Sequence, residues 1–390
     1  MYIKKSKLVL ITIIVVLATA IVSVTAVNPF GTDYISLIKL SYATKLLDAL
    51  YLEDVDKKEA AEMAVAGVAA SIGDPYTGYV WGDDATQYME QMEGNYCGVG
   101  LYIENDTEEN LISVVSPIAG GPAEKAGIAT GDKIIMIDGQ TYTGAQLSEA
   151  SSYMKGEEGT DVVVTIRSAI DGTNRDITLT RSRIVIESVS GKMLDNNIGY
   201  INITQFTEGV AESFSQQLKT LDEQNMKSLI IDLRNNPGGI LEEVISVSSL
   251  FVPEERIVTY TLDKYENRTE YLSEHTEKKY SLPIVVLING GSASASEVLT
   301  GVLRDYKIAT VIGEQSYGKG VVQSVVPIGF DSLMTVTVSR YYTPNGECIH
   351  GTGITPDIIS EMEPEKTVRL SSLQLSEDTQ LIEAINFLKK

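Results

Sequence analysis

Histidine and cysteine are scarce in this chain, which contains only His275, His350, Cys97 and Cys348. A zinc site built from these residue types needs about four ligands at short spacing, and a disulfide framework needs several cysteine pairs. Both are therefore disfavoured, although the sequence leaves open whether the two cysteines meet. Any chemistry must use other side chains, and we expect neither a metal nor an organic cofactor.

Basic residues are also in the minority, with 31 Lys and Arg against 53 Asp and Glu and a formal net charge of -22. A surface with this charge repels phosphate backbones, which argues against nucleic acid as a partner. Hydrophobic residues make up 43% of the chain and charged residues 22%, so disordered and low-complexity classes do not fit. The 390 residues allow two or three domains with packed cores.

One long apolar run stands near the amino terminus. Leu8 to Val27 is a stretch of 20 residues without a charge, and three lysines precede it. Its length suits a bilayer-spanning helix, and lysines before such a helix keep the amino terminus in the cytoplasm. We therefore expect a single-pass cell-membrane protein whose remaining residues are extracytoplasmic. The alternative is a secreted protein whose signal peptide is cleaved after the small residues of Val24-Thr25-Ala26.

The pattern changes three times after this segment of residues 1–27. Residues 28–92 have apolar side chains at three- and four-residue spacing, which predicts amphipathic helices that pack on a neighbouring domain or pair with a second copy. Residues 93–183 contain short apolar runs between turns, which predicts a small α+β domain. Residues 184–362 alternate strands with longer helices, which predicts an α/β core with a largely parallel sheet, and residues 363–390 end in one more helix.

A candidate nucleophile lies in the segment Gly291-Ser292-Ala293-Ser294-Ala295-Ser296-Glu297. This segment follows an apolar strand expected at 283–288 and opens a helix, so free backbone N–H groups stand beside a hydroxyl with small neighbours. Such amides stabilise the oxyanion that forms when a carbonyl is attacked. The competing interpretation is structural, because Ser294-x-x-Glu297 is also a capping box, and this segment alone favours capping.

A serine nucleophile needs a base, and the positions of the two histidines pair neither of them with a serine. A lysine can act as the base when burial lowers its pKa, because the neutral amine then accepts the hydroxyl proton. Lys319 is the candidate, since no other Lys or Arg occurs between Lys307 and Arg340. The valine-rich strand that follows it is expected to be buried, where a charged amine is costly unless it loses its proton or is paired.

The neighbours of Lys319 decide whether its amine can be neutral. In a regular strand Lys319, Val321 and Gln323 project from one face, so Gln323 can hold the amine by a hydrogen bond. The alternatives are a surface lysine in a glycine loop, or a lysine kept charged by a salt bridge to Glu314 or Asp331.

A third element is the strand end Asp232-Leu233-Arg234-Asn235-Asn236-Pro237-Gly238-Gly239, which leads into another helix. Glycines let the backbone come close to a ligand, and an amide of Gly238 or Gly239 can supply a second oxyanion donor. A pair of glycines in a turn has little meaning by itself, so this role depends on the other two elements.

Together these segments resemble the C-terminal processing peptidases, also called tail-specific proteases, which are serine endopeptidases with a Ser-Lys pair. The resemblance covers nearly the whole chain after residue 27, and the motifs occur in the family's order. The motifs similar to a PDZ domain are Gly98-Val99-Gly100-Leu101, Gly121 to Ile128, Gly131-Asp132 and Ile137-Asp138-Gly139. The motifs similar to the protease core are Gly199 to Phe206, Asp232 to Gly239, Gly291 to Glu297, Gly318 to Gln323, Tyr341 to Pro344 and Gly353 to Asp357.

The resemblance implies a ClpP/crotonase-like α/β protease core with an inserted PDZ domain and an amino-terminal helical region. It also implies catalytic roles. Ser294, the middle serine of its string, is the nucleophile, Lys319 is the general base and Gln323 is the positioning glutamine.

Further roles follow from the same resemblance. The amide of Ala295 and that of Gly238 or Gly239 form the oxyanion hole. In the PDZ domain, the amides around Gly98, Val99 and Gly100 capture the free carboxylate of a substrate, and the peptide adds as a strand beside Leu101.

We therefore expect an exported serine endopeptidase that recognises the carboxy-terminal tail of protein substrates through its PDZ domain and cleaves near it through an acyl-enzyme. Its partners are proteins or peptides with apolar free carboxyl ends, and a homodimer is one option for its assembly. The alternative is an exported PDZ peptide-binding scaffold with a silent protease core. A third option is a lipid or acyl-ligand binder, which would not need Lys319.

Overall fold

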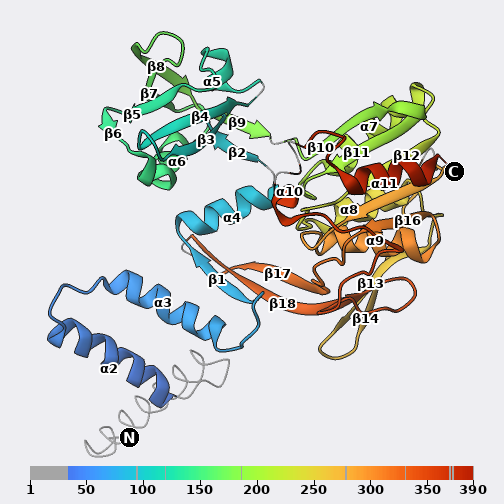
Figure 1. The fold of residues 1–390 in the computed structure, drawn as a ribbon. Coiled ribbons are helices and arrows are strands. Elements are labelled where there is room, and N and C mark those ends of the chain that lie inside the picture. Colours follow the sequence, from blue (N-terminus) through green and yellow to red (C-terminus); the bar gives the residue numbers. More distant parts are fainter. Residues whose placement is uncertain are drawn as a thin grey trace, which may run out of the picture. The chain divides into compact units, whose positions relative to one another are not determined.

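We describe the chain from a computed structural model, which covers residues 34–93, 95–118, 120–185, 187–276, 279–329, 331–368, 370 and 373–389 (Figure 1). The chain divides into two compact units, residues 1–79 and residues 80–390, and each is described by itself. The expected anchor or signal segment, Leu8 to Val27, lies outside the described residues. Among the described residues, no helix is both long and apolar enough to cross a membrane.

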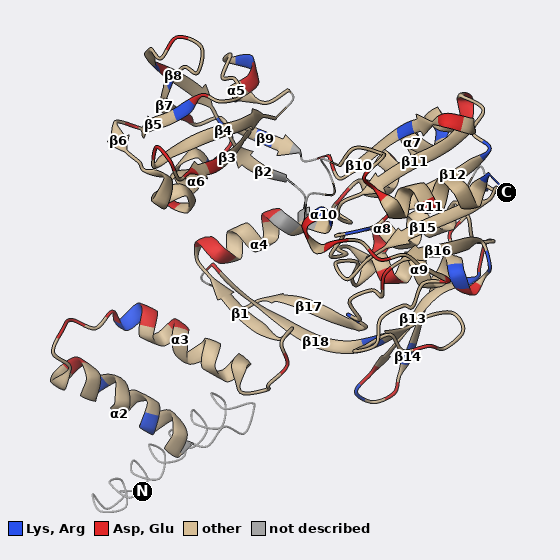
Figure 2. Ribbon diagram, viewed as in Figure 1, with Lys and Arg blue, Asp and Glu red and all other residues tan. Residues whose placement is uncertain are grey.

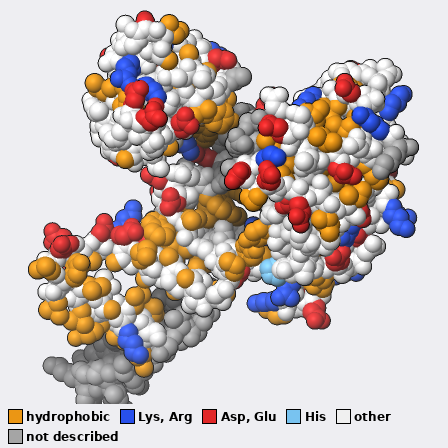
Figure 3. All heavy atoms as spheres, in the orientation of Figure 1, with side chains coloured by type: hydrophobic (Ala, Val, Ile, Leu, Met, Phe, Trp, Pro, Cys, Tyr) orange, Lys and Arg blue, Asp and Glu red, His pale blue; other side chains and the backbone are white. Residues whose placement is uncertain are grey.

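The described part of the first unit, from residue 34 on, contains two helices, α2 (Tyr34–Leu50) and α3 (Lys57–Ala70), as the spacing of its apolar residues predicts. Asp56 caps α3, because its carboxylate accepts hydrogen bonds from two backbone N–H groups of the first turn. Large apolar side chains of α2 remain exposed, among them Ile38 at 67% and Leu50 at 76%. Figure 3 shows hydrophobic side chains gathered over both helices. This unit thus presents an apolar surface that it does not bury itself.

Within the second unit, residues 95–185 form the expected small α+β domain. Its six-stranded sheet has the order β3-β4-β5-β7-β8 with β6 paired to β5, and β2 and β9 form a separate two-stranded ribbon. Ile112, Ile134 and Val164 are among its fully buried core residues. The elements are β2 (Asn95–Gly98), β3 (Leu101–Asp106), β4 (Leu111–Pro117), α5 (Pro122–Lys125), β5 (Lys133–Ile137), β6 (Gln140–Thr141), η1 (Gly144–Gln146), α6 (Leu147–Met154), β7 (Asp161–Arg167), β8 (Asn174–Thr180) and β9 (Ser182–Val185).

The α/β core is built on a sheet with the order β10-β11-β12-β15-β16-β19. Its strands from β11 to β19 pair in parallel and β10 is antiparallel, which confirms the largely parallel sheet. Helices α7, α8 and α9 pack against one face and α11 against the other. The elements are β10 (Val189–Leu194), η2 (Asp195–Asn197), β11 (Ile198–Ile203), α7 (Val210–Glu223), β12 (Ser228–Asp232), α8 (Leu241–Ser249), β15 (Ile284–Ile288), α9 (Ala295–Asp305), β16 (Ala309–Gly313), β19 (Ile358–Ile359), α10 (Pro364–Val368) and α11 (Thr379–Leu388).

The central strands explain where polar groups can gather. Every residue of β12 and β15 is buried, and β11, β15 and β16 contain no charged residue (Figure 2). Because parallel strands end at the same edge of a sheet, the loops that follow β12 and β15 leave the core side by side. These loops contain two of the three segments with candidate catalytic or oxyanion-hole residues.

A further sheet has the order β1-β18-β13-β14, with β17 also paired to β18. Its strands are β1 (Gly78–Trp81), β13 (Ile257–Asp263), β14 (Arg268–Leu272), β17 (Val321–Pro327) and β18 (Ser332–Tyr342), and α4 (Asp83–Glu93) follows β1. The valine-rich strand expected after Lys319 is β17, but only its first residue, Val321, is buried. The reason is that β17 pairs with β18 alone among the described strands and so lies at an edge.

Cys97 and Cys348 are both free thiols.

Candidate active site

Ser294 occupies the sharp turn between β15 and α9. The loop before it is fixed by Ser292, whose hydroxyl donates to the Leu233 carbonyl (2.8 Å) and accepts from the Asn289 N–H (3.0 Å). Ser294 itself has a φ of 55° and a ψ of -117°, a conformation that residues other than glycine rarely adopt. Such strain persists where surrounding contacts enforce it, and it is frequent at functional sites.

Glu297, in the first turn of α9, connects the serine to the lysine segment. Its carboxylate accepts hydrogen bonds from the backbone N–H groups of Ser294 (2.9 Å) and Lys319 (2.9 Å). It also accepts from the Gly318 N–H (2.7 Å) and the Ser316 hydroxyl (2.6 Å). Burial raises the pKa of Glu297, although these four hydrogen bonds act in the opposite direction. One buried carboxylate thus fixes the backbone of both candidate catalytic residues.

The capping interaction expected at Ser294-x-x-Glu297 is therefore present, since Glu297 accepts from the N–H of the residue that precedes the helix. The same carboxylate also holds the 316–319 segment, which a helix cap does not do. The capping and catalytic interpretations of Ser294 are thus compatible. Sequence reasoning missed this second role of Glu297, because the capping spacing gives no sign of partners from another segment.

Lys319 is half-buried in the glycine loop before β17. Burial lowers the pKa of its amine below the ordinary value, while the negative charge of Glu297 acts in the opposite direction. The backbone around it is tightly held, because the Tyr341 hydroxyl donates to the Lys319 carbonyl. A β-carbon added to Gly320 would sit only 2.5 Å from the backbone nitrogen of His350. The direction of the pKa shift is the one that a lysine base requires.

Gln323 does not follow the regular strand alternation expected from the sequence. Strand β17 begins only at Val321, and its register against β18 shifts between Val322 and Gln323. Because a bulge breaks the two-residue alternation, the argument that placed Lys319 and Gln323 on one strand face is not supported. The Nε2 atom of Gln323 is buried and has no hydrogen-bond partner among the described residues. Glu314, one of the acids considered as a partner for the lysine, accepts hydrogen bonds from the Met362 N–H and the Gln380 side chain.

Gly238 lies beside the start of α9, and the next residue, Gly239, lies against Phe206. A β-carbon added to Gly238 would sit 2.7 Å from the Ser294 β-carbon and 2.8 Å from the Ala295 nitrogen. The Gly238 N–H is already bonded to the Asn236 side chain (2.8 Å). The N–H groups of Gly239 and Ala295 have no acceptor within the described part of the chain. Of the two glycine amides that the sequence left open, Gly239 is therefore the one that is available.

Further hydrogen bonds join the loop after β12 to the serine loop. The Asn236 carbonyl accepts from the Ala293 N–H and the Ser296 hydroxyl, each at 3.0 Å. Asn235 and Asn289 exchange two hydrogen bonds of 2.8 Å, one through backbone and side chain and one between side chains. The structure thus brings together the three segments that the sequence singled out separately.

The segment from Gly98 to Leu101 belongs to the small α+β domain, whose core is separate from that of the α/β sheet. Val99 is buried, and its carbonyl accepts from the Ala123 N–H (2.9 Å), while the Gly100 carbonyl accepts from the Ile118 N–H (3.0 Å). Gly100 has a φ of 76°, which favours glycine. These contacts hold the segment against the start of α5.

Comparison with known proteins identifies families for the α/β core and for the small α+β domain. Residues 197–360 match the profile of Peptidase family S41, and residues 113–168 match that of a PDZ domain. The chain is 37% identical over 352 residues to a carboxy-terminal-processing protease of Bartonella bacilliformis, a match that covers 88% of this chain and 79% of that protein. It is 35% identical over 325 residues to carboxy-terminal processing protease CtpA of Bacillus subtilis, which covers 83% of this chain and 69% of the relative.

A solved structure shows the same architecture. A Bacteroides fragilis protein assigned to the S41 proteases aligns with 89% of this chain and 97% of its own, with a TM-score of 0.54 and 15% sequence identity. At this identity the likeness concerns the fold.

Proposed function

Because this chain belongs to the carboxy-terminal processing proteases of peptidase family S41, we propose that it hydrolyses peptide bonds with Ser294 as nucleophile and Lys319 as general base. Membership of the family makes it a serine-type protease with an α/β core and a PDZ domain, and its substrates are proteins. The observation that carries the assignment of residues is the buried Glu297 carboxylate, which holds the backbone of Ser294 and that of Lys319.

The proposed reaction begins with the neutral amine of Lys319, which takes the proton of Ser294 as the serine oxygen attacks the scissile carbonyl. The free amides of Ala295 and Gly239 stabilise the resulting oxyanion. The protonated lysine then gives its proton to the leaving amine, and water releases the acyl group from the serine. The resemblance to the family gives Gln323 the role of orienting the lysine, and its buried Nε2 atom, which has no partner among the described residues, is available for that bond.

Substrate selection is the task that we propose for the PDZ domain. The free carboxylate of a tail binds to the amides around Gly98 to Gly100, and the peptide adds as a strand beside β3. Apolar tails suit this docking mode because their side chains alternate into pockets of the domain. Amidation of the peptide's carboxyl end should therefore weaken binding and slow cleavage, whereas equal cleavage of acid and amide would remove the PDZ domain from recognition.

Export and assembly are further parts of the proposal. Leu8 to Val27 anchors the chain in the membrane, or is removed as a signal peptide, so that the catalytic part is extracytoplasmic. The exposed apolar side chains of α2 and α3 support pairing with a second copy. A protease added to spheroplasts or protoplasts should digest an extracytoplasmic catalytic part, which tests the location. Sedimentation should give the mass of two chains, which tests the dimer.

Substitution of the two proposed catalytic residues tests the assignment. Ser294→Ala and, separately, Lys319→Ala should abolish cleavage of a peptide with an apolar free carboxyl end while the unfolding transition is retained. A silent peptide-binding scaffold would bind this peptide without cleaving it even as wild type. Full activity in either variant would contradict the proposed roles.

A further inference from the structure

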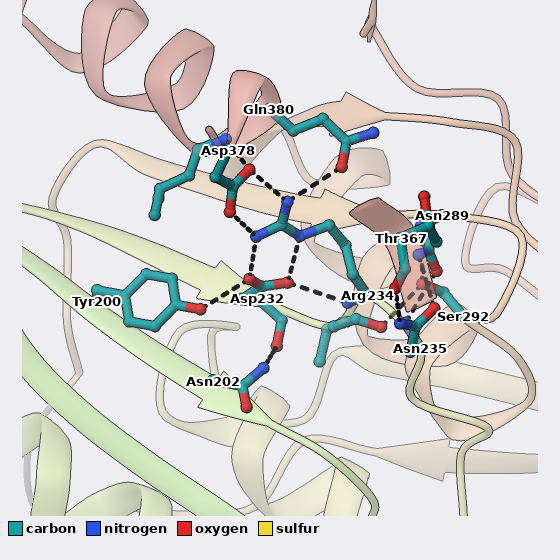
Figure 4. Close-up of polar contacts among 12 residues, drawn as sticks. Tyr200, Asn202, Asp232, Arg234, Asn235, Asn289, Ser292, Thr367, Asp378 and Gln380 are labelled. Atoms are coloured by element: carbon teal, nitrogen blue, oxygen red, sulfur yellow. Dashed lines mark hydrogen bonds and ion pairs between the residues drawn. The ribbon is translucent and has the colours of Figure 1, made fainter. Parts of the chain in front are cut away.

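The carboxy-terminal helix α11 brings two polar side chains to a buried arginine of the core. The Arg234 side chain, which follows β12, is 1% exposed, and all of its guanidinium nitrogens have acceptors (Figure 4). It donates to both carboxylate oxygens of Asp232 (2.9 and 2.5 Å) and to both of Asp378 (2.8 Å each). A further bond reaches the side-chain oxygen of Gln380 (3.1 Å).

This arrangement holds the guanidinium in one place from two sides. Burial by itself lowers the pKa of Arg234, but the negative charges and hydrogen bonds of Asp232 and Asp378 outweigh it and raise the pKa. Each carboxylate forms two bonds with the planar guanidinium, an arrangement that fixes orientation as well as distance. Tyr200 donates to Asp232 (2.8 Å) and completes the cluster.

Arg234 opens the loop that carries Gly238 and Gly239. The next residue, Asn235, donates to the Thr367 carbonyl (2.9 Å), which also belongs to the carboxy-terminal segment. The opposite side of this loop is bonded to the serine loop, as described above. The loop is therefore fixed between the serine loop and the carboxy-terminal segment.

We propose that Asp378 is a positioning residue for the hydrolysis, acting through Arg234 on the loop that supplies the Gly239 amide. Asp378 and Gln380 lie outside residues 197–360, the part of the chain that matches the peptidase family. The carboxy-terminal segment is then a component of the active site. This inference rests on the proposed function, because the use of the Gly239 amide is part of that proposal.

The expected effect concerns the transition state and not substrate binding. The oxyanion exists only once the carbonyl has been attacked, so a displaced donor lowers kcat and leaves KM nearly unchanged. Complete loss of an oxyanion donor costs about 10²- to 10³-fold in kcat, and displacement of one should cost about tenfold or more.

Asp378→Asn separates this role from helix capping. Asp378 is also the N-cap of α11, where its carboxylate accepts from the Leu381 N–H (2.9 Å). Asparagine caps helices as well as aspartate does, but its NH₂ group would face the N–H groups of Arg234. Glu383→Gln is the matched control, because it removes one negative charge from an exposed position of the same helix.

The experiment compares the full-length wild type with both variants. It measures kcat and KM for a peptide with an apolar free carboxyl end and the affinity of a peptide aldehyde, which forms a tetrahedral adduct with a serine hydroxyl. Asp378→Asn should lower kcat about tenfold or more, weaken aldehyde binding by a similar factor and leave KM within about twofold. Glu383→Gln should change none of the three.

Two outcomes would overturn the inference: a folded Asp378→Asn variant that keeps kcat and aldehyde affinity, or one that changes only KM. If Asp378→Asn does not fold, Gln380→Met serves instead, because it removes one acceptor of Arg234 and leaves both carboxylates. It also removes the bonds that the Gln380 side chain donates to Glu314 and to the Ser360 carbonyl, so its unfolding transition is measured alongside. Its kcat should fall about threefold with KM unchanged, and an unchanged kcat would contradict the proposal. A wild type that does not cleave the peptide would contradict the proposed function itself, so the two failures are distinguishable.

Discussion

Gly238 lies so close to Ser294 that a β-carbon on the glycine would sit 2.7 Å from the serine's own β-carbon. The glycine also has a φ of 99°, which side chains tolerate poorly. Gly238→Ala should therefore displace the serine turn and reduce kcat/KM more than about 100-fold, with a stability loss of about 1–3 kcal/mol from the backbone strain. Peptide cleavage and urea unfolding measure the two effects.

Gly209→Ala is the matched control for this prediction. Gly209 has a similar φ of 83°, but a β-carbon there would meet nothing within 4 Å. The variant should lose about 1 kcal/mol of stability and keep its activity. Equal activities of the two alanine variants would show that the contact between Gly238 and Ser294 has no part in catalysis.

The rate of cleavage should depend on pH through Lys319. Only the neutral amine can accept the serine proton, so kcat/KM should rise with pH as the amine loses its proton. Burial lowers the pKa of Lys319, so the ascending limb should lie below the ordinary lysine value of 10.5. A pH profile of kcat/KM measures this limb, and a rate that falls over the same range would contradict a lysine base.

The burial of Lys319 should also lower the free energy of unfolding of the protein. The pKa of the amine is lower in the folded than in the unfolded chain, so the folded state binds the proton less tightly, and this lowers the free energy of unfolding at pH 7. The loss of stability becomes smaller as the pH rises to 10.5, because the amine then loses its proton in the unfolded chain too. Lys319→Met should therefore stabilise the protein more at pH 7 than at pH 10.5, as measured by urea unfolding. Lys219→Met, at an exposed position of α7, should show no such difference.

Glu297→Gln should change both the rate and its pH dependence. One carboxylate oxygen of Glu297 accepts from the Ser294 and Lys319 N–H groups, and the other accepts from the Ser316 hydroxyl and the Gly318 N–H. The carboxamide has one acceptor oxygen, so one of these two pairs of bonds is lost, the loop that carries Lys319 is held less firmly, and kcat should fall about tenfold or more. The negative charge of Glu297 raises the pKa of Lys319, so its removal should move the ascending limb of kcat/KM to lower pH. Glu212→Gln on the exposed side of α7 provides the control. A limb that moves to higher pH would refute the electrostatic coupling.

Much of the fold follows from periodicity. The apolar run of β15 and the helical spacing of α11 gave both elements within a few residues, because each buries a continuous face against the core. The hairpin of β13 and β14 was not predicted. Most of β14 is exposed and carries charged residues, so it has no apolar run for a pattern to reveal.

The candidate site could be predicted only in part. The residues of the Ser294 and Lys319 segments, together with their resemblance to a family, indicated the candidate nucleophile and the candidate base. Nothing local showed that Glu297 holds both segments, that a bulge precedes Gln323, or that Asp378 reaches an arginine 144 positions away. Such contacts depend on tertiary packing, for which a single sequence carries no pattern.

The most direct test of the account is the reaction of the serine with a phosphonate probe, followed by mass analysis of the labelled residue. We predict that wild type is labelled at Ser294 alone, at a rate that rises with pH. Lys319→Met should react about 100-fold more slowly, the usual contribution of a general base. Labelling at another residue, or equal rates in the two proteins, would contradict the assignment of a lysine-activated serine.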